Sequence, residues 1–119
     1  MSMRNRHAFT MIELLIVVII IGVMAAIAMP RFADSRRKAY ITAMKSDLRN
    51  VVSAAESHFA DDGTYAQWTG PSATNAITLV YTGESDGWEA TATHAAVPGV
   101  VCRLARRRTV DTKSEPICE

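Results

Sequence analysis

The stretch that decides the fold is Phe9-Thr10-Met11-Ile12-Glu13 together with the apolar run behind it, Leu14-Leu15-Ile16-Val17-Val18-Ile19-Ile20-Ile21-Gly22-Val23-Met24-Ala25-Ala26-Ile27-Ala28-Met29. Residues 14–29 carry no charge and would cover roughly 24 Å as a helix. Extended back to Phe9, the helix would be about 31 Å long, enough to cross a hydrocarbon core of about 30 Å. The sequence therefore predicts a membrane-spanning helix with one acid, Glu13, inside the span.

The size and charge of the chain narrow the possible functions. Its 119 residues make one small domain and leave no room for a separate catalytic module. Thirteen Lys and Arg stand against twelve Asp and Glu, so bulk charge does not favour a nucleic-acid binder. The chain has neither a Ser/His/Asp order nor a glycine-rich phosphate loop, and its histidines lie far apart in sequence. We expect no enzyme activity and no cofactor.

A cleavable secretory signal peptide is an alternative interpretation of the N-terminus. Arg4 and Arg6 precede the apolar run, and small residues near its end, Ala26 and Ala28, imitate a cleavage site. Cleavage after Ala28 would remove the whole segment. Glu13 interrupts the start of the apolar region, however, and the run leads directly into a second helical pattern. Both features favour a helix that stays in the protein.

Residues Ala8 to Leu14, with a short basic leader before them and an apolar helix after them, resemble the class III signal of type IV pilins and pseudopilins. The resemblance implies that a prepilin peptidase cuts on the cytoplasmic side before Phe9, methylates the new N-terminus and leaves the apolar helix in place. Ala8 stands where the family usually has Gly, and Met11 where Leu is common. Ala8 and Phe9 are the implied processing residues.

The resemblance also implies assembly through the N-terminal helix, with roles for Phe9, Glu13 and Pro30. Glu13 corresponds to the family's acidic fifth residue, and Pro30 resembles its helix-bending proline, because proline lacks an amide hydrogen and disturbs the preceding turn. In dry surroundings an unpaired charge is far less stable than a paired one. We therefore expect the Phe9 amine of one subunit to pair with Glu13 of its neighbour and to set the axial register.

The charges flanking the span do not by themselves give the family's orientation. Arg4 and Arg6 precede it, but four basic residues closely follow it: Arg31, Arg36, Arg37 and Lys38. The positive-inside rule alone favours an external N-terminus. The resemblance requires a cytoplasmic one, because the leader is cut there. We expect a single-pass protein of the bacterial inner membrane before assembly and a cell-surface pilus afterwards.

An amphipathic helix is predicted beyond the span. No Gly or Pro occurs from Phe32 to Phe59, and apolar residues recur at spacings of three and four: Ile41, Met44, Leu48, Val51, Val52, Ala55 and Phe59. We interpret the polar residues between them as a solvated or neighbour-facing surface: Lys45, Asp47, Arg49, Asn50 and Glu56. Gly63 is suited to end the helix. Asp61 and Asp62 could hold calcium, but no further ligands are spaced nearby, so we expect capping and no metal.

A small antiparallel sheet is predicted for the rest of the chain. Residues 77–82 and 88–94 alternate apolar or small with polar side chains on either side of 83–87, which indicates a hairpin. A further strand is expected over residues 100–105. We expect three or four antiparallel strands, with one face on the helical stripe from Leu48 to Phe59.

The two cysteines, Cys102 and Cys118, show no metal-ligand spacing. They suggest one disulfide formed in an oxidising compartment, and two free cytosolic thiols are the alternative. A bridge would close a loop of about seventeen residues and stabilise the head by roughly 3 kcal/mol.

The densest basic cluster of the chain consists of four arginines, Arg103, Arg106, Arg107 and Arg108. DNA is a disfavoured partner, because aromatic interleaving is absent and acids lie close by: Asp111, Glu115 and Glu119. Pairing between subunits, or plain solubility, is the better interpretation of the cluster.

The predicted fold is α+β and pilin-like: one long N-terminal helix on a small antiparallel sheet with a C-terminal disulfide loop. We expect a leader at 1–8, a transmembrane assembly helix at 9–30 and a periplasmic or extracellular head at 31–119. Within the head, a helix continuation covers 31–60, a loop 61–76, and the sheet and disulfide region 77–119.

The resemblance implies a structural, non-enzymatic subunit of a type IV pilus, a filament that serves adhesion, motility or DNA uptake. Its partners would be further copies of the chain, other pilins or pseudopilins, the prepilin peptidase and the inner membrane. A pseudopilin of the type II secretion machine is one alternative, and a membrane-anchored binding protein that never polymerises is another. The cysteine-bounded C-terminal region and the lack of an obvious calcium site favour the pilin.

Overall fold

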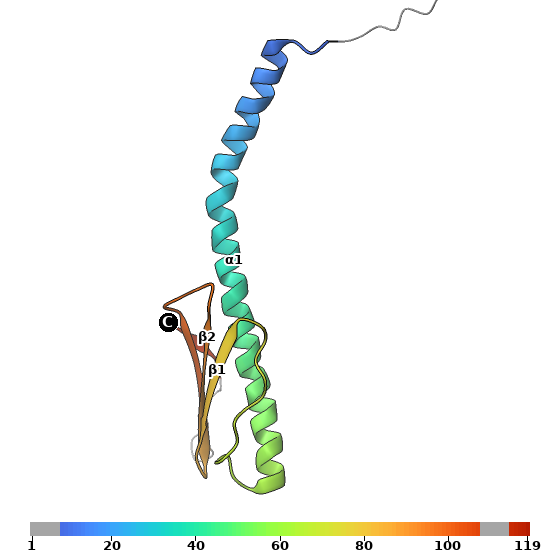
Figure 1. Cartoon of the computed structure of the whole chain (residues 1–119). Coiled ribbons are helices and arrows are strands. Elements are labelled where there is room, and N and C mark those ends of the chain that lie inside the picture. Colours follow the sequence, from blue (N-terminus) through green and yellow to red (C-terminus); the bar gives the residue numbers. More distant parts are fainter. Residues whose placement is uncertain (1–7, 108–114) are drawn as a thin grey trace, which may run out of the picture. The chain divides into compact units, whose positions relative to one another are not determined.

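One long helix and four short strands make up the computed structural model, which describes residues 8–107 and 115–119. Helix α1 covers Met11–Asp62 and is followed by β1 (Ile77–Gly83), β2 (Gly87–His94), β3 (Val101–Arg107) and β4 (Ile117–Cys118) (Figure 1). The predicted α+β fold is confirmed. The chain divides into two compact units, Met1–Ser35 and Arg36–Glu119.

The described part of the first unit is dominated by the N-terminal half of α1, whose apolar side chains are exposed. Met11 is 90% exposed, and even Val17, the most covered of the large apolar side chains here, is 48% exposed. The most apolar window of α1 has a mean hydropathy of 2.9, and none of it is buried. By length and composition, α1 can cross a membrane. This apolar surface needs lipid or other helices to cover it.

In the second unit, the C-terminal half of α1 buries one stripe. Met44, Leu48, Val51 and Ala55 are at most 1% exposed and follow the helical repeat of three and four residues. The helix ends at Asp62, where Gly63 adopts a φ of 71° and donates its N–H to the Phe59 carbonyl at 2.8 Å. Glycine takes this left-handed conformation without steric penalty. Gly63 ends the helix as predicted, but α1 continues two residues beyond the predicted boundary at residue 60.

The four strands form one antiparallel sheet in the order β1-β2-β3-β4. The β1–β2 hairpin is closed by the Glu84 N–H, which donates to the Gly87 carbonyl at 2.7 Å. Its position confirms the predicted hairpin. The third strand lies where it was predicted but continues two residues further, to Arg107.

The inner face of this sheet packs on the buried stripe of α1, as Figure 1 shows for the two elements. Its buried residues alternate along the two central strands: Trp88, Ala90, Ala92, Cys102 and Leu104. The two alanines in the middle of β2 and the larger helix side chains Met44 and Leu48 belong to the same buried core. The prediction that the sheet packs on this side of α1 is confirmed. The buried stripe begins at Met44 and not at Leu48, and Phe59 is only partly buried at the edge of the core.

Three aromatic side chains pack together at one end of the core. The Trp68 ring meets the edge of Tyr81 at 4.8 Å between centroids, and Tyr81 stacks on Trp88 at 5.9 Å. Nearby, Gly83 lets the Tyr65 backbone approach β1 closely, because a Cβ at position 83 would collide with the Tyr65 carbonyl oxygen. The aromatic residues therefore serve packing of the head.

Two acids that were predicted on the polar face of α1 hold the head together. Asp47 is only 7% exposed, and its carboxylate accepts the Thr74 N–H and the Thr74 hydroxyl, both at 2.8 Å. Glu56 accepts the Tyr65 hydroxyl at 3.0 Å. The interpretation of Asp47 as solvated or neighbour-facing is wrong, because the loop after α1 folds back over this side of the helix and supplies its donors. Glu56 also has a donor from this loop, but its side chain stays 39% exposed.

Cys102 and Cys118 form a disulfide that joins β3 to β4. The bridge is flanked by two backbone bonds between Val101 and Glu119, at 2.9 and 3.1 Å. The predicted disulfide is confirmed, and Cys102 is fully buried. Part of the loop that it closes, residues 108–114, lies outside the described residues.

Candidate assembly and processing site

The start of α1 is organised by a reciprocal pair of Thr10 and Glu13. Glu13 Oε2 accepts the Thr10 N–H and the Thr10 hydroxyl, both at 2.9 Å, and the Glu13 N–H donates to Thr10 Oγ1 at 3.3 Å. This is a capping box, in which the first residues of a helix satisfy one another's free amides. We did not predict it from the sequence, although a Thr three residues before a Glu at the start of an apolar run is its signature.

The capping box changes the interpretation of Glu13. The carboxylate has local donors and lies at the positive end of the helix, so it stabilises the first turn before any partner arrives. Both hydrogen bonds from Thr10 use Oε2, and a carboxylate can accept about four. Glu13 is exposed. It therefore retains the capacity to bind a second cation or donor.

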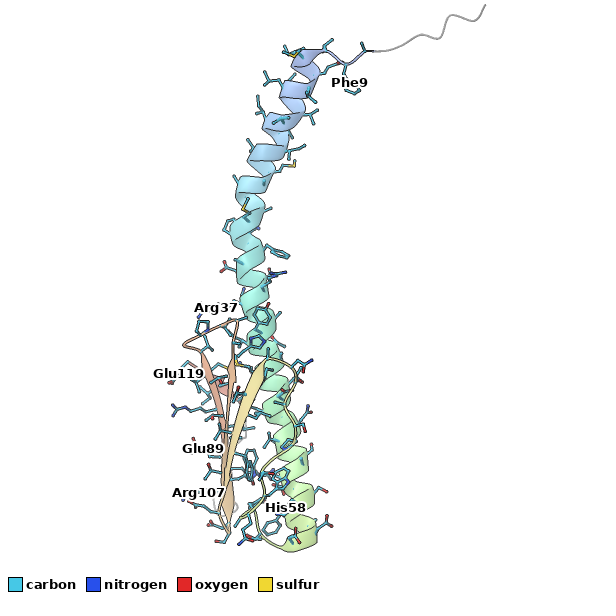
Figure 2. The ribbon with its side chains drawn as sticks, in the orientation of Figure 1. Phe9, Arg37, His58, Glu89, Arg107 and Glu119 are labelled. Carbon is cyan, nitrogen blue, oxygen red and sulfur yellow. A yellow bond between two sulfur atoms is a disulfide. The ribbon has the colours of Figure 1, made fainter. Side chains whose placement is uncertain are left out.

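The implied cleavage point lies just before this helix. Phe9 is 85% exposed and, like Ala8, precedes the first helical residue, Met11; Figure 2 shows its side chain standing clear of the helix. Residues 1–7 of the predicted leader, with Arg4 and Arg6, lie outside the described residues. The Ala8–Phe9 bond thus lies on a non-helical, exposed stretch.

Pro30 lies inside α1, and the helix continues through it. The proline ring has no N–H to donate to the Ala26 carbonyl, so one hydrogen bond of the helical ladder is lost at this point. Gly22, by contrast, lies in open space, and a Cβ added there would meet no neighbouring side chain within 4 Å. Nothing within the described part of the chain requires a glycine at this position.

The predicted site residues thus fall into two groups. Phe9 and Glu13 flank the first turn of α1, and Pro30 lies further along the same unit. Cys102 and Cys118 belong to the other unit, where their disulfide links β3 to β4.

Arg106 of the predicted arginine cluster makes an ion pair within the head. Arg106 lies 3.4 Å from Glu56 as an ion pair, whereas Arg103 and Arg107 are exposed. Arg108 and Asp111 lie outside the described residues. Within residues 8–107 and 115–119, no three His, Cys, Asp or Glu side chains are close enough to share a metal ion.

Asp62 pairs with His58 in the last turn of α1, with Nδ1 and Oδ2 3.0 Å apart. The same His58 ring stacks on Trp68 at a centroid distance of 5.5 Å. The contact of Asp62 is therefore with its own helix. Together, these features define a small α+β protein. The first half of its helix is exposed, apolar and long enough to cross a membrane.

Comparison with known proteins identifies the N-terminal segment. Residues 3–29 match the family model of the prokaryotic N-terminal methylation motif. The chain is 40% identical over 65 residues to the type IV major pilin protein PilA of Myxococcus xanthus, an alignment that covers 55% of this chain and 29% of PilA. No solved structure matches the chain with significance.

Two further relatives match the same part of the chain. The type II secretion system core protein G of Pseudomonas aeruginosa is 31% identical over 65 residues, covering 55% of this chain and 46% of that protein. The type IV wide pilus major component PilA4 of Thermus thermophilus is 38% identical over 63 residues, covering 53% and 48%. The alignments therefore span less than half the length of these relatives. The N-terminal segment of the chain is thus similar to the corresponding segments of type IV pilins and of a type II secretion core protein.

Proposed function

We propose that this protein is a structural subunit of a type IV pilus, held in the inner membrane before assembly and polymerised through the apolar half of α1. The observation that carries the proposal is the exposure of that half: none of its most apolar window is buried within the chain. Lipid covers such a surface in the membrane, and the same helix of neighbouring subunits covers it in a filament. Relatives named as type IV major pilins and fimbrial proteins support this function.

Processing is the first step of the proposed function. A prepilin peptidase would cut between Ala8 and Phe9, with the N-terminus in the cytoplasm, so that residues 1–8 are the leader, 9–30 the assembly helix and 31–119 the head. The methylation motif over residues 3–29 supports this step. Mass spectrometry of assembled protein should find an N-methylated Phe9 as the first residue. An intact Met1 in the filament would refute processing.

Assembly is the second step. Removal of the leader creates a cationic amine at Phe9, and Glu13 of a neighbour is the acid that can pair with it. Each charge then offsets the desolvation of the other, because a paired charge in a dry helix bundle is much more stable than an isolated one. The capping box would present the carboxylate at the start of the helix, where the amine of the next subunit can reach it.

A Glu13→Val variant tests the assembly step. We expect the variant to insert into the membrane but to yield few or no ordered filaments, because the Phe9 amine lacks its counterion. Asp61→Val, which removes an exposed acid near the C-terminal end of α1, is the matched control and should polymerise normally. Electron microscopy of sheared surface material measures the filament yield, and a normal yield from Glu13→Val would contradict the proposal.

A pseudopilin of the type II secretion machine is the second candidate, and the relatives named as core protein G are the observation that favours it. The disulfide-bounded C-terminal region favours the pilin. Long surface fibres that contain this chain support a pilus, whereas retention in the inner membrane together with loss of protein secretion in a deletion strain supports a pseudopilin. Retention without any secretion defect would support a membrane-anchored protein that does not polymerise.

A further inference from the structure

A group of basic side chains follows the apolar run of α1 closely. We define the basic belt as four residues within nine positions of Met29: Arg31, Arg36, Arg37 and Lys38. All four are exposed, and Figure 2 shows the side chain of Arg37 on α1. Asp34 is the one acid of residues 31–38, so this stretch carries four positive charges and one negative charge.

The belt lies at the depth of lipid headgroups when the apolar run spans a bilayer. A bilayer is about 40–45 Å thick with a hydrocarbon core of about 30 Å, which leaves roughly 5–8 Å of headgroup layer on each side. Nine residues of helix rise about 14 Å, so Lys38 is at most this far along the axis from Met29. Long basic side chains can reach back towards the interface. All four charges therefore lie in the headgroup layer or within a Debye length of about 8 Å from it.

The belt can meet an external partner on several sides of the helix. Among the described residues, no ion pair involves Arg31, Arg37 or Lys38. Arg37 and Lys38 are consecutive, so their side chains leave the helix about 100° apart. A flat acidic protein surface would contact one side of such a helix. Headgroups surround a helix that crosses a bilayer and can contact every side.

We propose that the basic belt binds the anionic headgroups of phospholipids in the leaflet where α1 leaves the membrane, at the end opposite the leader. Lys and Arg near a membrane surface are attracted to anionic lipids with an effect of roughly fivefold in binding per charge. This contact holds the unassembled subunit at one depth. The proposal requires insertion of the apolar run but not filament assembly.

Lipid selectivity of the full chain tests the proposal. The protein is reconstituted in phosphatidylcholine bilayers that contain a trace of spin-labelled phosphatidylglycerol or spin-labelled phosphatidylcholine, and electron paramagnetic resonance measures how strongly each lipid associates with it. We expect wild type to prefer phosphatidylglycerol by roughly twofold or more, and high salt to weaken the preference. An Arg37→Gln/Lys38→Gln variant should lose most of it.

Two further variants keep the test specific. Lys45→Gln/Arg49→Gln removes the same charge from positions seven or more residues further along α1 and should retain the preference. Arg37→Lys/Lys38→Arg keeps the charge and should also retain it, which separates loss of charge from a misfolded helix. Equal lipid selectivity in wild type and Arg37→Gln/Lys38→Gln would overturn the proposal. So would an equal loss of selectivity in the Lys45→Gln/Arg49→Gln control.

Discussion

The two halves of α1 are parts of one helix, but they handle apolar surface in opposite ways. Up to Ser35, no side chain of α1 is buried, and large apolar residues lie on all sides of the helix. Beyond Arg36, apolar residues form one stripe, which is covered by a four-stranded sheet. One sheet can cover one stripe, whereas a helix that is apolar all round needs lipid or several helices around it. The pattern of apolar residues thus separates the half that folds within the chain from the half that needs partners.

Truncating one aliphatic side chain in each half should give the largest difference between them. Leu48→Ala removes a fully buried side chain from the head and should lower its free energy of unfolding by about 2–5 kcal/mol. Ile16→Ala, at a position 51% exposed, should change it by less than about 0.5 kcal/mol. Urea unfolding of the full chain in detergent micelles, followed by tryptophan fluorescence, measures both. Similar losses in the two variants would contradict the comparison.

Removal of the disulfide should cause the next largest loss of stability, and this loss should be confined to the head. Cys102→Ser/Cys118→Ser opens a loop of about seventeen residues, and closing a loop of this length stabilises a fold by roughly 3 kcal/mol. We expect a lower melting temperature of the sheet and unchanged helix content in the apolar half, measured by circular dichroism in micelles. A melting temperature equal to that of wild type would show that the disulfide does not stabilise the β3–β4 pairing.

The buried acid Asp47 should contribute a smaller amount. Asp47→Ala leaves the Thr74 N–H and hydroxyl without their acceptors, which should lower the free energy of unfolding by about 1–3 kcal/mol and loosen the loop before β1. Asp61→Ala, at an exposed position of the same helix, is the control and should have little effect. Hydrogen exchange at Thr74 reports on the loop directly, and unchanged protection in Asp47→Ala would count against this role.

The smallest effect is a pH dependence confined to the head, where all three tyrosines of the chain lie. Burial, with smaller effects of Tyr65 and Glu56, raises the pKa of Tyr81 to about 12, above a value of about 10 in the unfolded chain. The folded head holds this proton more tightly, so the stabilisation is complete below about pH 10 and is lost as the pH rises towards 12. Absorbance titration should show that Tyr81→Phe removes the tyrosine that ionises near pH 12. Loss of one that ionises near pH 10 would contradict the assignment.

Sequence patterns predicted most of the fold because they reflect local geometry. A helix repeat from Ile41 to Phe59, an alternating pair of segments around residues 83–87 and a glycine after Asp62 each depend on neighbours a few residues away. The Thr10–Glu13 capping box was equally local and could have been found from its spacing. Cleavage before Phe9 and the roles of Glu13 and Pro30 in assembly stay predictions for the experiments above.

By itself, the sequence determined the long helix, the first three strands and which half of the helix lacks a covering surface within the chain. The position of the short β4 strand came only from the structure. Only the tertiary structure decided the roles of Asp47 and Glu56, because their partners Thr74 and Arg106 lie 27 and 50 residues away. On the helix alone these acids belong to a polar face. The path of the loop and the position of the sheet bring donors to them, and both depend on the packing of the whole head.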